Sequence, residues 1–233
     1  MKTAKNTGRI VGIMLLVQLA GLIVPFALLH PMTNTAYLEN AAGYSFQIKT
    51  AVLLLLANCA LTIGISVTAF PVFRQYSSAV AVLLTALSAI MFALQAVDNA
   101  HLMSMLSLSQ EYARKSNSQE LFQTLSAIVR STRRWTHYSE LLVIDSWIFA
   151  LYASLHHFAI VPRWVSAFGL ITVLLHFTAI PLPLFLGYSG LTPLGVPMAL
   201  SHITLAIWLI IKGFEEGIPD CVKSRIAPIK TIL

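Results

Sequence analysis

Two pairs of ionisable residues, each pair three positions apart, lie in stretches that are otherwise apolar enough to cross a membrane. Asp98 precedes His101 in one stretch, and His137 precedes Glu140 in another. Residues at i and i+3 share a helix face, so each pair presents two ligating groups together. Imidazole and carboxylate groups suit zinc or a non-haem metal. The spacing therefore predicts a metal or proton-handling site at Asp98, His101, His137 and Glu140, although it matches no fixed metal motif.

Two arginines directly precede the second pair and give it an alternative role. Arg133 and Arg134 would lie just outside the same span, where they could bind anionic lipid headgroups or another anion. They could instead neutralise Asp98 and Glu140, and the polar group would then be a salt-bridge cluster in the headgroup zone. The sequence leaves the metal site and the salt-bridge cluster open as alternatives.

A second set of polar residues is predicted near the middle of the bilayer, on five different helices. Counted at 1.5 Å per residue from the start of each span, these side chains fall about 8 to 12 residues deep. Ionisable residues at that depth cost roughly 2.5 to 3.5 kcal/mol each to insert, so they pair inside the bundle or line a wet cavity. The set consists of Gln18, Asn58, Asp145, His176 and His202.

Three interpretations of this second set remain open. Asp145 with His176 or His202 could relay protons or bind a substrate cation in a transporter. His176 and His202 could instead be axial ligands of a haem, although cytochromes usually carry two such pairs and only one candidate pair is found. The set could also be polar glue, with Gln18, Asn58 and a protonated Asp145 bonding between helices. We expect no cofactor other than a divalent metal at the first site, and no haem.

Composition defines the class of protein that must position these residues. The chain has 233 residues, of which 57% are hydrophobic and only 10% are charged, whereas soluble domains carry about 25% charged residues. About 20 apolar residues cross the roughly 30 Å of bilayer hydrocarbon, so the length allows about six spans. The net charge of +6 comes from residues near span ends, which favours contact with membrane lipids and argues against nucleic-acid binding.

The apolar runs predict an all-α fold, a polytopic bundle of about six transmembrane helices forming a single membrane domain over residues 1–233. In the longest loop, apolar residues recur at helical spacing from Leu121 to Val129. This pattern predicts an amphipathic helix over residues 118–132, at the membrane interface or packed back on the bundle. The predicted spans cover residues 10–29, 50–72, 78–106, 135–160, 164–186 and 191–211.

The start of the chain and the charges of its loops indicate an orientation. A basic stretch, MKTAKNTGR, precedes a first span that is too long for a cleavable signal, so the span is predicted to remain as an anchor. Lys and Arg residues are more numerous in loops on the N-terminal side than on the opposite side. We therefore expect a multi-pass inner-membrane protein with both termini in the cytoplasm.

Two stretches of the sequence resemble a known family. RIVGIMLLVQLAGLIV, and the run from His137 through ALYASLHHFAIVPRWVSAFGLITVLL, are similar to bacterial membrane proteins grouped as domain of unknown function 4386 (DUF4386). The resemblance extends over residues 9–187, in pattern more than identity. Val165 and Ser166 replace the Leu-Gly usual after the Pro-Arg-Trp turn, and Glu140 and Asp145 stand where relatives are mostly apolar. The resemblance implies a compact multi-span helical protein and no established activity.

The leading functional prediction is a membrane protein with a polar intramembrane cavity that binds or transports a small molecule or an ion. One alternative is a membrane-embedded metal-dependent enzyme that uses Asp98, His101, His137 and Glu140. Another is a structural or regulatory subunit without chemistry of its own. No nucleophile motif such as G-x-S-x-G is found, which weighs against an enzyme. The sequence predicts no particular oligomeric state.

Overall fold

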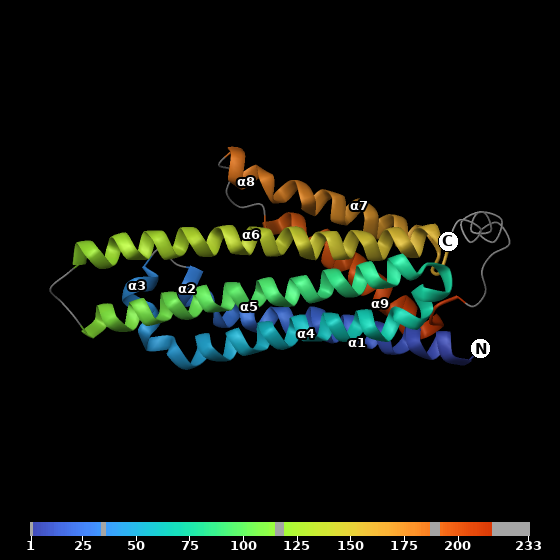
Figure 1. The fold of residues 1–233 in the computed structure, drawn as a ribbon, viewed down its shortest axis with the longest axis horizontal. Helices are drawn as coiled ribbons and strands as arrows, with labels where there is room; N and C mark the ends of the chain where they lie inside the picture. The colour runs from blue at the N-terminus through green and yellow to red at the C-terminus, as the bar shows by residue number, and fades with distance from the viewer. Residues whose placement is uncertain (1, 34–35, 115–118, 187–191, 216–233) are drawn as a thin grey trace. The chain divides into compact units, whose positions relative to one another are not determined.

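A computed structural model of the chain describes residues 2–33, 36–114, 119–186 and 192–215. Every regular element in these ranges is a helix, which confirms the predicted all-α class. The longer helices are α1 (Lys2–Leu28), α4 (Ser45–Tyr76), α5 (Ser78–Arg114), α6 (Gln119–His157), α7 (Arg163–Ala179) and α9 (Val196–Lys212) (Figure 1). The shorter ones are α2 (His30–Thr33), α3 (Tyr37–Asn40), η1 (Ala41–Tyr44), α8 (Pro181–Leu186) and η2 (Thr192–Gly195).

Four helical stretches of the described chain are long and apolar enough to cross a membrane. They are Ala4–Leu28, Tyr37–Tyr76, Ser78–Arg114 and Gln119–His157. α7 and α9 are also apolar but have 17 residues each, or about 25 Å at 1.5 Å per residue. α5 and α6, with 37 and 39 residues, are much longer than the roughly 30 Å of hydrocarbon requires. The fold is thus that of a helical membrane bundle.

α6 joins two elements that the sequence predicts separately. The amphipathic helix expected over residues 118–132 and the span expected over residues 135–160 form one continuous helix, Gln119–His157 (Figure 1). No Pro or Gly occurs between residues 119 and 157, so nothing interrupts the backbone hydrogen bonds where the sequence changes from amphipathic to apolar. The prediction of a separate amphipathic element was therefore wrong: it is the first part of α6.

The helices contribute to two compact units. Unit 1 comprises Met1–Val17, Ile63–Ser88 and Ile144–Leu233, and unit 2 comprises Gln18–Thr62 and Ala89–Val143. α1, α4, α5 and α6 therefore each give one part to each unit, whereas α7 and α9 belong to unit 1 alone.

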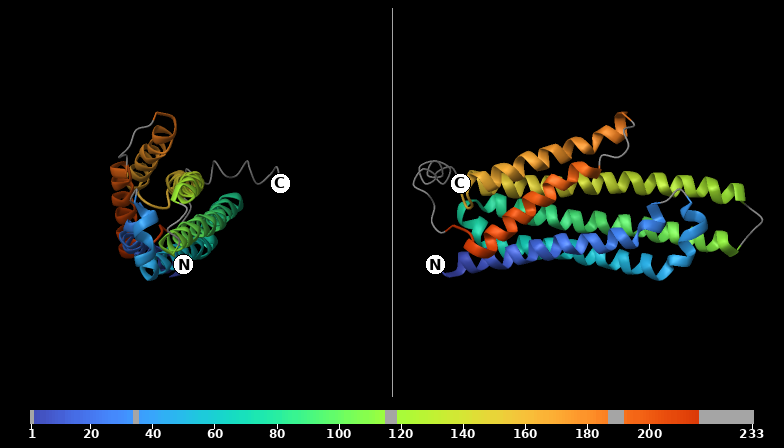
Figure 2. Two further views of the ribbon diagram at one scale, coloured as in Figure 1. Left: turned by 90° about the vertical axis from the view of Figure 1, so that its left-hand side faces the viewer. Right: turned by 180° about the vertical axis from the view of Figure 1, so that it is seen from behind.

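Unit 1 has an apolar core that includes Phe73, Trp147, Tyr152 and Leu205. α7 and α9 lie side by side in this unit (Figure 2). α7 also approaches α6 closely, because a Cβ atom on Gly169 would lie only 2.2 Å from Cδ1 of Tyr152. Small residues such as glycine let the backbones of membrane helices pack closely in this way.

Unit 2 is built on the antiparallel packing of α5 and α6. The rings of Tyr112 on α5 and Phe122 on α6 lie 5.7 Å apart, with an edge-to-face geometry. η1, which directly precedes α4, is held to α5 by the backbone N–H of Ala42, which donates to Oγ of Ser109 over 2.9 Å. The register of these helices determines which polar residues of α5 and α6 can meet.

Candidate functional site

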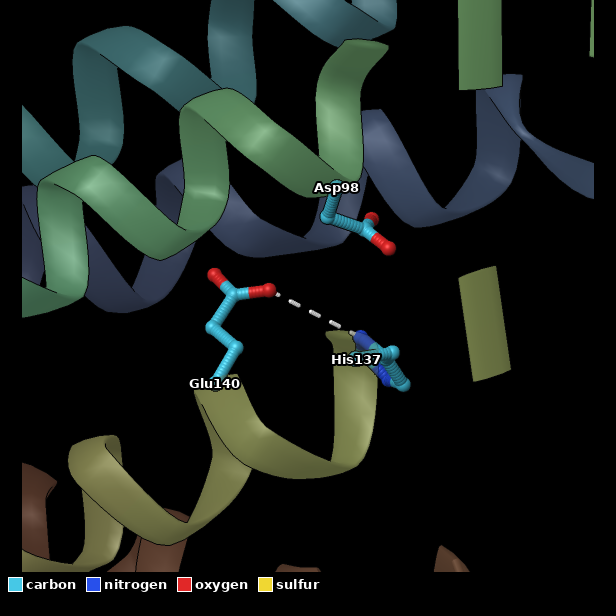
Figure 3. A group of neighbouring side chains, drawn as sticks. All are labelled: Asp98, His137 and Glu140. Carbon is cyan, nitrogen blue, oxygen red and sulfur yellow. Dashed lines mark ion pairs between the residues drawn. The ribbon is translucent and has the colours of Figure 1, made fainter. Parts of the chain in front are cut away.

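Three side chains that could bind a metal project between α5 and α6 in unit 2. Asp98 comes from α5, and His137 and Glu140 come from α6 (Figure 3). One ligand atom from each lies within 4.8 Å of the others. Asp98 and Glu140 are 2% and 3% exposed, and His137 is partly exposed. These three residues are called the carboxylate–histidine cluster below.

The cluster also has a neighbouring cation, Arg133. Its Nε lies 3.4 Å from Oδ1 of Asp98, and Nδ1 of His137 lies 3.8 Å from Oε2 of Glu140. Arg133 and His137 are four residues apart, so they share the face of α6 that meets Asp98. Oδ1 of Asp98, Nε of Arg133 and Nδ1 of His137 are buried and make no hydrogen bond to the described residues. These polar atoms therefore attract one another through their charges, but they still lack a hydrogen-bond partner among the described residues.

The ligand set could hold a divalent cation once its side chains close around the ion. Metal–nitrogen and metal–oxygen bonds of about 2.0 to 2.2 Å in a tetrahedral zinc site put two ligand atoms about 3.4 Å apart. The ligand atoms lie within 4.8 Å of one another, so the longest separation would have to shorten by about 1 Å through side-chain rotation. One imidazole with two carboxylates suits zinc, manganese or ferrous iron.

His101 and Arg134, which the sequence grouped with this site, lie outside the cluster. α5 and α6 are antiparallel, so a step of three residues forward on α5 corresponds to a step backward on α6. His101 is consequently level with residues that precede His137, one turn nearer the α5–α6 connection. Arg134 is exposed, whereas its neighbour Arg133 points at Asp98.

Two amides on α5 flank Asp98 and hold α5 against α4. Nδ2 of Asn99 donates to the backbone carbonyl of Val52 over 3.0 Å, and Nε2 of Gln95 donates to Oδ1 of Asn99 over 3.0 Å. Sγ of Cys59 approaches Oε1 of Gln95 at 3.7 Å. Sequence reasoning did not assign Gln95 and Asn99 to a site, although their i, i+4 spacing around Asp98 is the signal that would have identified them.

An open groove of about 480 Å³ lies between α5 and α6 within unit 2. It is lined by Met103, Ser104, Ser107, Leu108, Glu111, Leu125 and Val129. Val129 is one helical turn from Arg133, so the groove begins close to the cluster. Its lining is mostly apolar, with serine and glutamate groups at intervals.

Gln18 and Asn58, expected at mid-membrane, take part in packing within unit 2. Nε2 of Gln18 donates to Oγ1 of Thr62, which bonds α1 to α4. Asn58 is 8% exposed, and a Cβ atom on Gly21 would lie 2.9 Å from its Oδ1. These contacts have the geometry of polar bonding between helices, which is the third interpretation that the sequence left open.

Asp145 and His176 meet in unit 1. Nδ1 of His176 lies 2.8 Å from Oδ1 and 2.9 Å from Oδ2 of Asp145. Asp145 is fully buried, while the side chain of His176 keeps 15% exposure. His176 stands in the last turn of α7, not halfway along a span that continues to residue 186, because the helix ends at Ala179 ahead of Pro181.

His202 has different partners in the same unit. Its Nδ1 donates to the backbone carbonyl of Met198 over 3.1 Å, and its ring lies edge-to-face against Tyr152 at 5.5 Å. The hydroxyl of Tyr152 donates in turn to Oγ of Ser201 over 3.4 Å. Of the two histidines that the sequence offered as partners of Asp145, the structure pairs the carboxylate with His176.

One comparison with known proteins gives a match. A family model described as "Domain of unknown function (DUF4386)" matches residues 10–213, a range that contains both the carboxylate–histidine cluster and the Asp145–His176 pair. No curated protein and no solved structure matches the chain.

Proposed function

The chain belongs to the DUF4386 family of domains of unknown function, and from this premise we propose that it is a multi-span bacterial inner-membrane protein that binds a divalent cation at Asp98, His137 and Glu140. The observation that carries the proposal is the convergence of three ligand atoms, from two helices, within 4.8 Å. Both carboxylates are almost fully buried, and buried charges are costly unless they are paired or bind a metal.

The charges at the site support a cation of charge two. Asp98 and Glu140 together carry two negative charges when ionised, and the nearby cationic side chain is Arg133, 3.4 Å from Asp98. A divalent ion bound between the carboxylates would balance both charges once Arg133 had turned away from Asp98. It would also use the lone pair of His137 Nδ1, which is buried and accepts no hydrogen bond from the described residues.

The position of the cluster along its helices supports a site near one membrane surface. Asp98 lies about 20 residues, or roughly 30 Å, from the start of α5 at Ser78. Glu140 lies about 17 residues, or roughly 25 Å, from the end of α6 at His157. With both termini in the cytoplasm, as the loop charges favour, the site would face the opposite side of the membrane and receive its ion from there.

The test is calorimetric titration of the purified full chain in detergent, freed of metal and then given zinc or manganese. We expect binding of one ion per chain, with affinity reduced at least tenfold in Asp98→Asn, His137→Ala and Glu140→Gln, because each loses a ligand. His101→Ala is the matched control, since His101 lies one turn from Asp98 and outside the cluster. Absence of binding, or equal loss in the control, would overturn the proposal.

A second candidate function is a metal-dependent enzyme at the same site. Three protein ligands leave a coordination position for water or substrate, as in catalytic zinc sites, and the groove between α5 and α6 could hold an amphipathic molecule. The assay is metal-dependent hydrolysis of ester and phosphoester lipid probes by the loaded chain. Hydrolysis that disappears in Glu140→Gln would support the enzyme, whereas metal binding without turnover on any probe would leave ion binding as the function.

A further inference from the structure

Asp145 and His176 meet through one ring nitrogen and both carboxylate oxygens. Nδ1 is almost equally distant from the two oxygens, at 2.8 and 2.9 Å, so both are within hydrogen-bond distance. When the hydrogen is on Nδ1, the imidazole donates to the carboxylate and Nε2 carries the lone pair.

Nε2, the other ring nitrogen of His176, lies beside the backbone of Gly195 at the end of η2. A Cβ atom built on Gly195 would lie 3.6 Å from Nε2 and 3.5 Å from Cδ2 of the ring, which is ordinary van der Waals contact. His176 also keeps 15% exposure while Asp145 has none, so the imidazole is the accessible member of the pair.

Several titratable side chains on the described parts of α6, α7 and α9 have other partners or stand apart from the pair. Tyr152 donates to Ser201 and His202 to Met198, and neither η2 nor α8 contains a titratable residue. Glu140 lies five residues, or about 7.5 Å along α6, from Asp145, and its carboxylate faces His137. The groups at the far ends of the three helices stand about 16 Å or more away along them, and they are His156, His157, Arg163 and Lys212.

We propose that the Asp145–His176 pair is a proton-binding site inside unit 1. A proton from water adds to the lone pair on Nε2 and later returns to water, while the Nδ1–H remains donated to Asp145. The pair then alternates between a net charge of −1 and an internally neutral carboxylate–imidazolium pair. Asp145 fixes the orientation and tautomer of the imidazole, as carboxylates do for functional histidines elsewhere. This proposal does not depend on the cation site in unit 2.

The experiment is nitrogen NMR of the full chain, labelled at histidine and embedded in lipid nanodiscs. His176→Gln identifies the signals of His176 by their disappearance. We expect Nδ1 of His176 to stay protonated throughout, while Nε2 changes from bare to protonated as the sample is acidified. A bare Nδ1 with a protonated Nε2, or an Nε2 that takes up no proton while the chain stays folded, would overturn the proposal.

Variants of the carboxylate separate a functional pair from simple packing. Asp145→Asn should release the fixed tautomer of His176, whereas Asp145→Glu should retain it because it keeps a carboxylate. His202→Gln is the matched control, because His202 is a second histidine of unit 1 and contacts Met198 and Tyr152 where His176 contacts a carboxylate. An Asp145→Asn spectrum identical to that of the unmodified chain would show that Asp145 does not hold the site.

Discussion

At the scale of single residues, Arg133 decides how the carboxylate–histidine cluster behaves without a metal. Its Nε lies 3.4 Å from Oδ1 of Asp98, so a cation is already present where a metal ion would bind. The guanidinium belongs to the chain and cannot leave, and it therefore competes with any ion for Asp98. Binding of a divalent ion would require Arg133 to turn away from Asp98.

This competition predicts opposite effects for neighbouring substitutions. Arg133→Gln should strengthen zinc or manganese binding by roughly tenfold, or about 1.4 kcal/mol, because the internal competitor is removed. Arg134→Gln is the control, since Arg134 is exposed and any effect of its charge is screened by salt. The measurement is calorimetric titration of both variants. Weaker binding in Arg133→Gln would mean that Arg133 supports the ligands and does not compete with the ion.

The residues of the cluster were partly predictable from sequence. The i, i+3 spacing and similar depth brought Asp98, His137 and Glu140 together, and these depend only on helix geometry. The exclusion of His101 depends on the register of α5 against α6, which no local pattern encodes. The partner of Asp145 likewise depended on packing: His176 and His202 looked equivalent by depth until the end of α7 at Ala179 placed His176 in its last turn.

At the scale of elements, the approach of α7 to α6 depends on one position. A Cβ atom on Gly169 would lie 2.2 Å from the ring of Tyr152, a separation that atoms do not adopt. The same face of α7 carries Thr172, whose hydroxyl lies 3.0 Å from Oγ of Ser201. Close packing at Gly169 thus brings α7 near enough to its neighbours to make its polar contacts, including that of His176.

Gly169→Ala should therefore lower the free energy of unfolding by about 1 to 3 kcal/mol, the usual cost of overpacking a core. Gly43→Ala provides the matched control, because nothing lies within 4 Å of a Cβ atom built on Gly43. Tryptophan fluorescence during unfolding of the detergent-solubilised chain would measure both. A similar loss in the two variants, or none in Gly169→Ala, would show that α7 does not pack as described.

The elements themselves were easier to predict than their ends. Long apolar runs indicated the spans, since only helices satisfy the backbone inside a bilayer without a sheet partner. The continuity of α6 was missed because composition changes near Trp135, and a change of composition is not a break in the backbone. α7 ends at Ala179, just before Pro181, which cannot continue the helical hydrogen bonds, whereas α1 and α4 continue past Pro25 and Pro71.

At the scale of the whole molecule, the orientation of the chain in the membrane determines which side supplies the cation. Cys59 is buried, so single accessible cysteines can be introduced in a Cys221→Ser background. Ser131→Cys, on the polar part of α6, should react with an impermeant maleimide added outside intact cells. Arg74→Cys, at the end of α4, should react only after the membrane is opened. Both positions are exposed, and the reverse pattern would contradict cytoplasmic termini.

The division into two units could not be predicted from the sequence, because it runs through the middle of four helices. Residues 17 and 18 of α1, for instance, belong to different units, and no change of composition marks that point. The two polar groups nevertheless fall in separate units, the cluster in unit 2 and the Asp145–His176 pair in unit 1. Each can therefore be tested without the other.

The most direct test of the cation site is the X-ray absorption spectrum of the zinc-loaded full chain. The account predicts an ion bound by a single imidazole nitrogen and by carboxylate oxygens, at about 2.0 to 2.2 Å. In His137→Ala the imidazole scattering should vanish. A first shell of water oxygens alone, a sulfur ligand, or imidazole scattering that persists in His137→Ala would contradict the site at Asp98, His137 and Glu140.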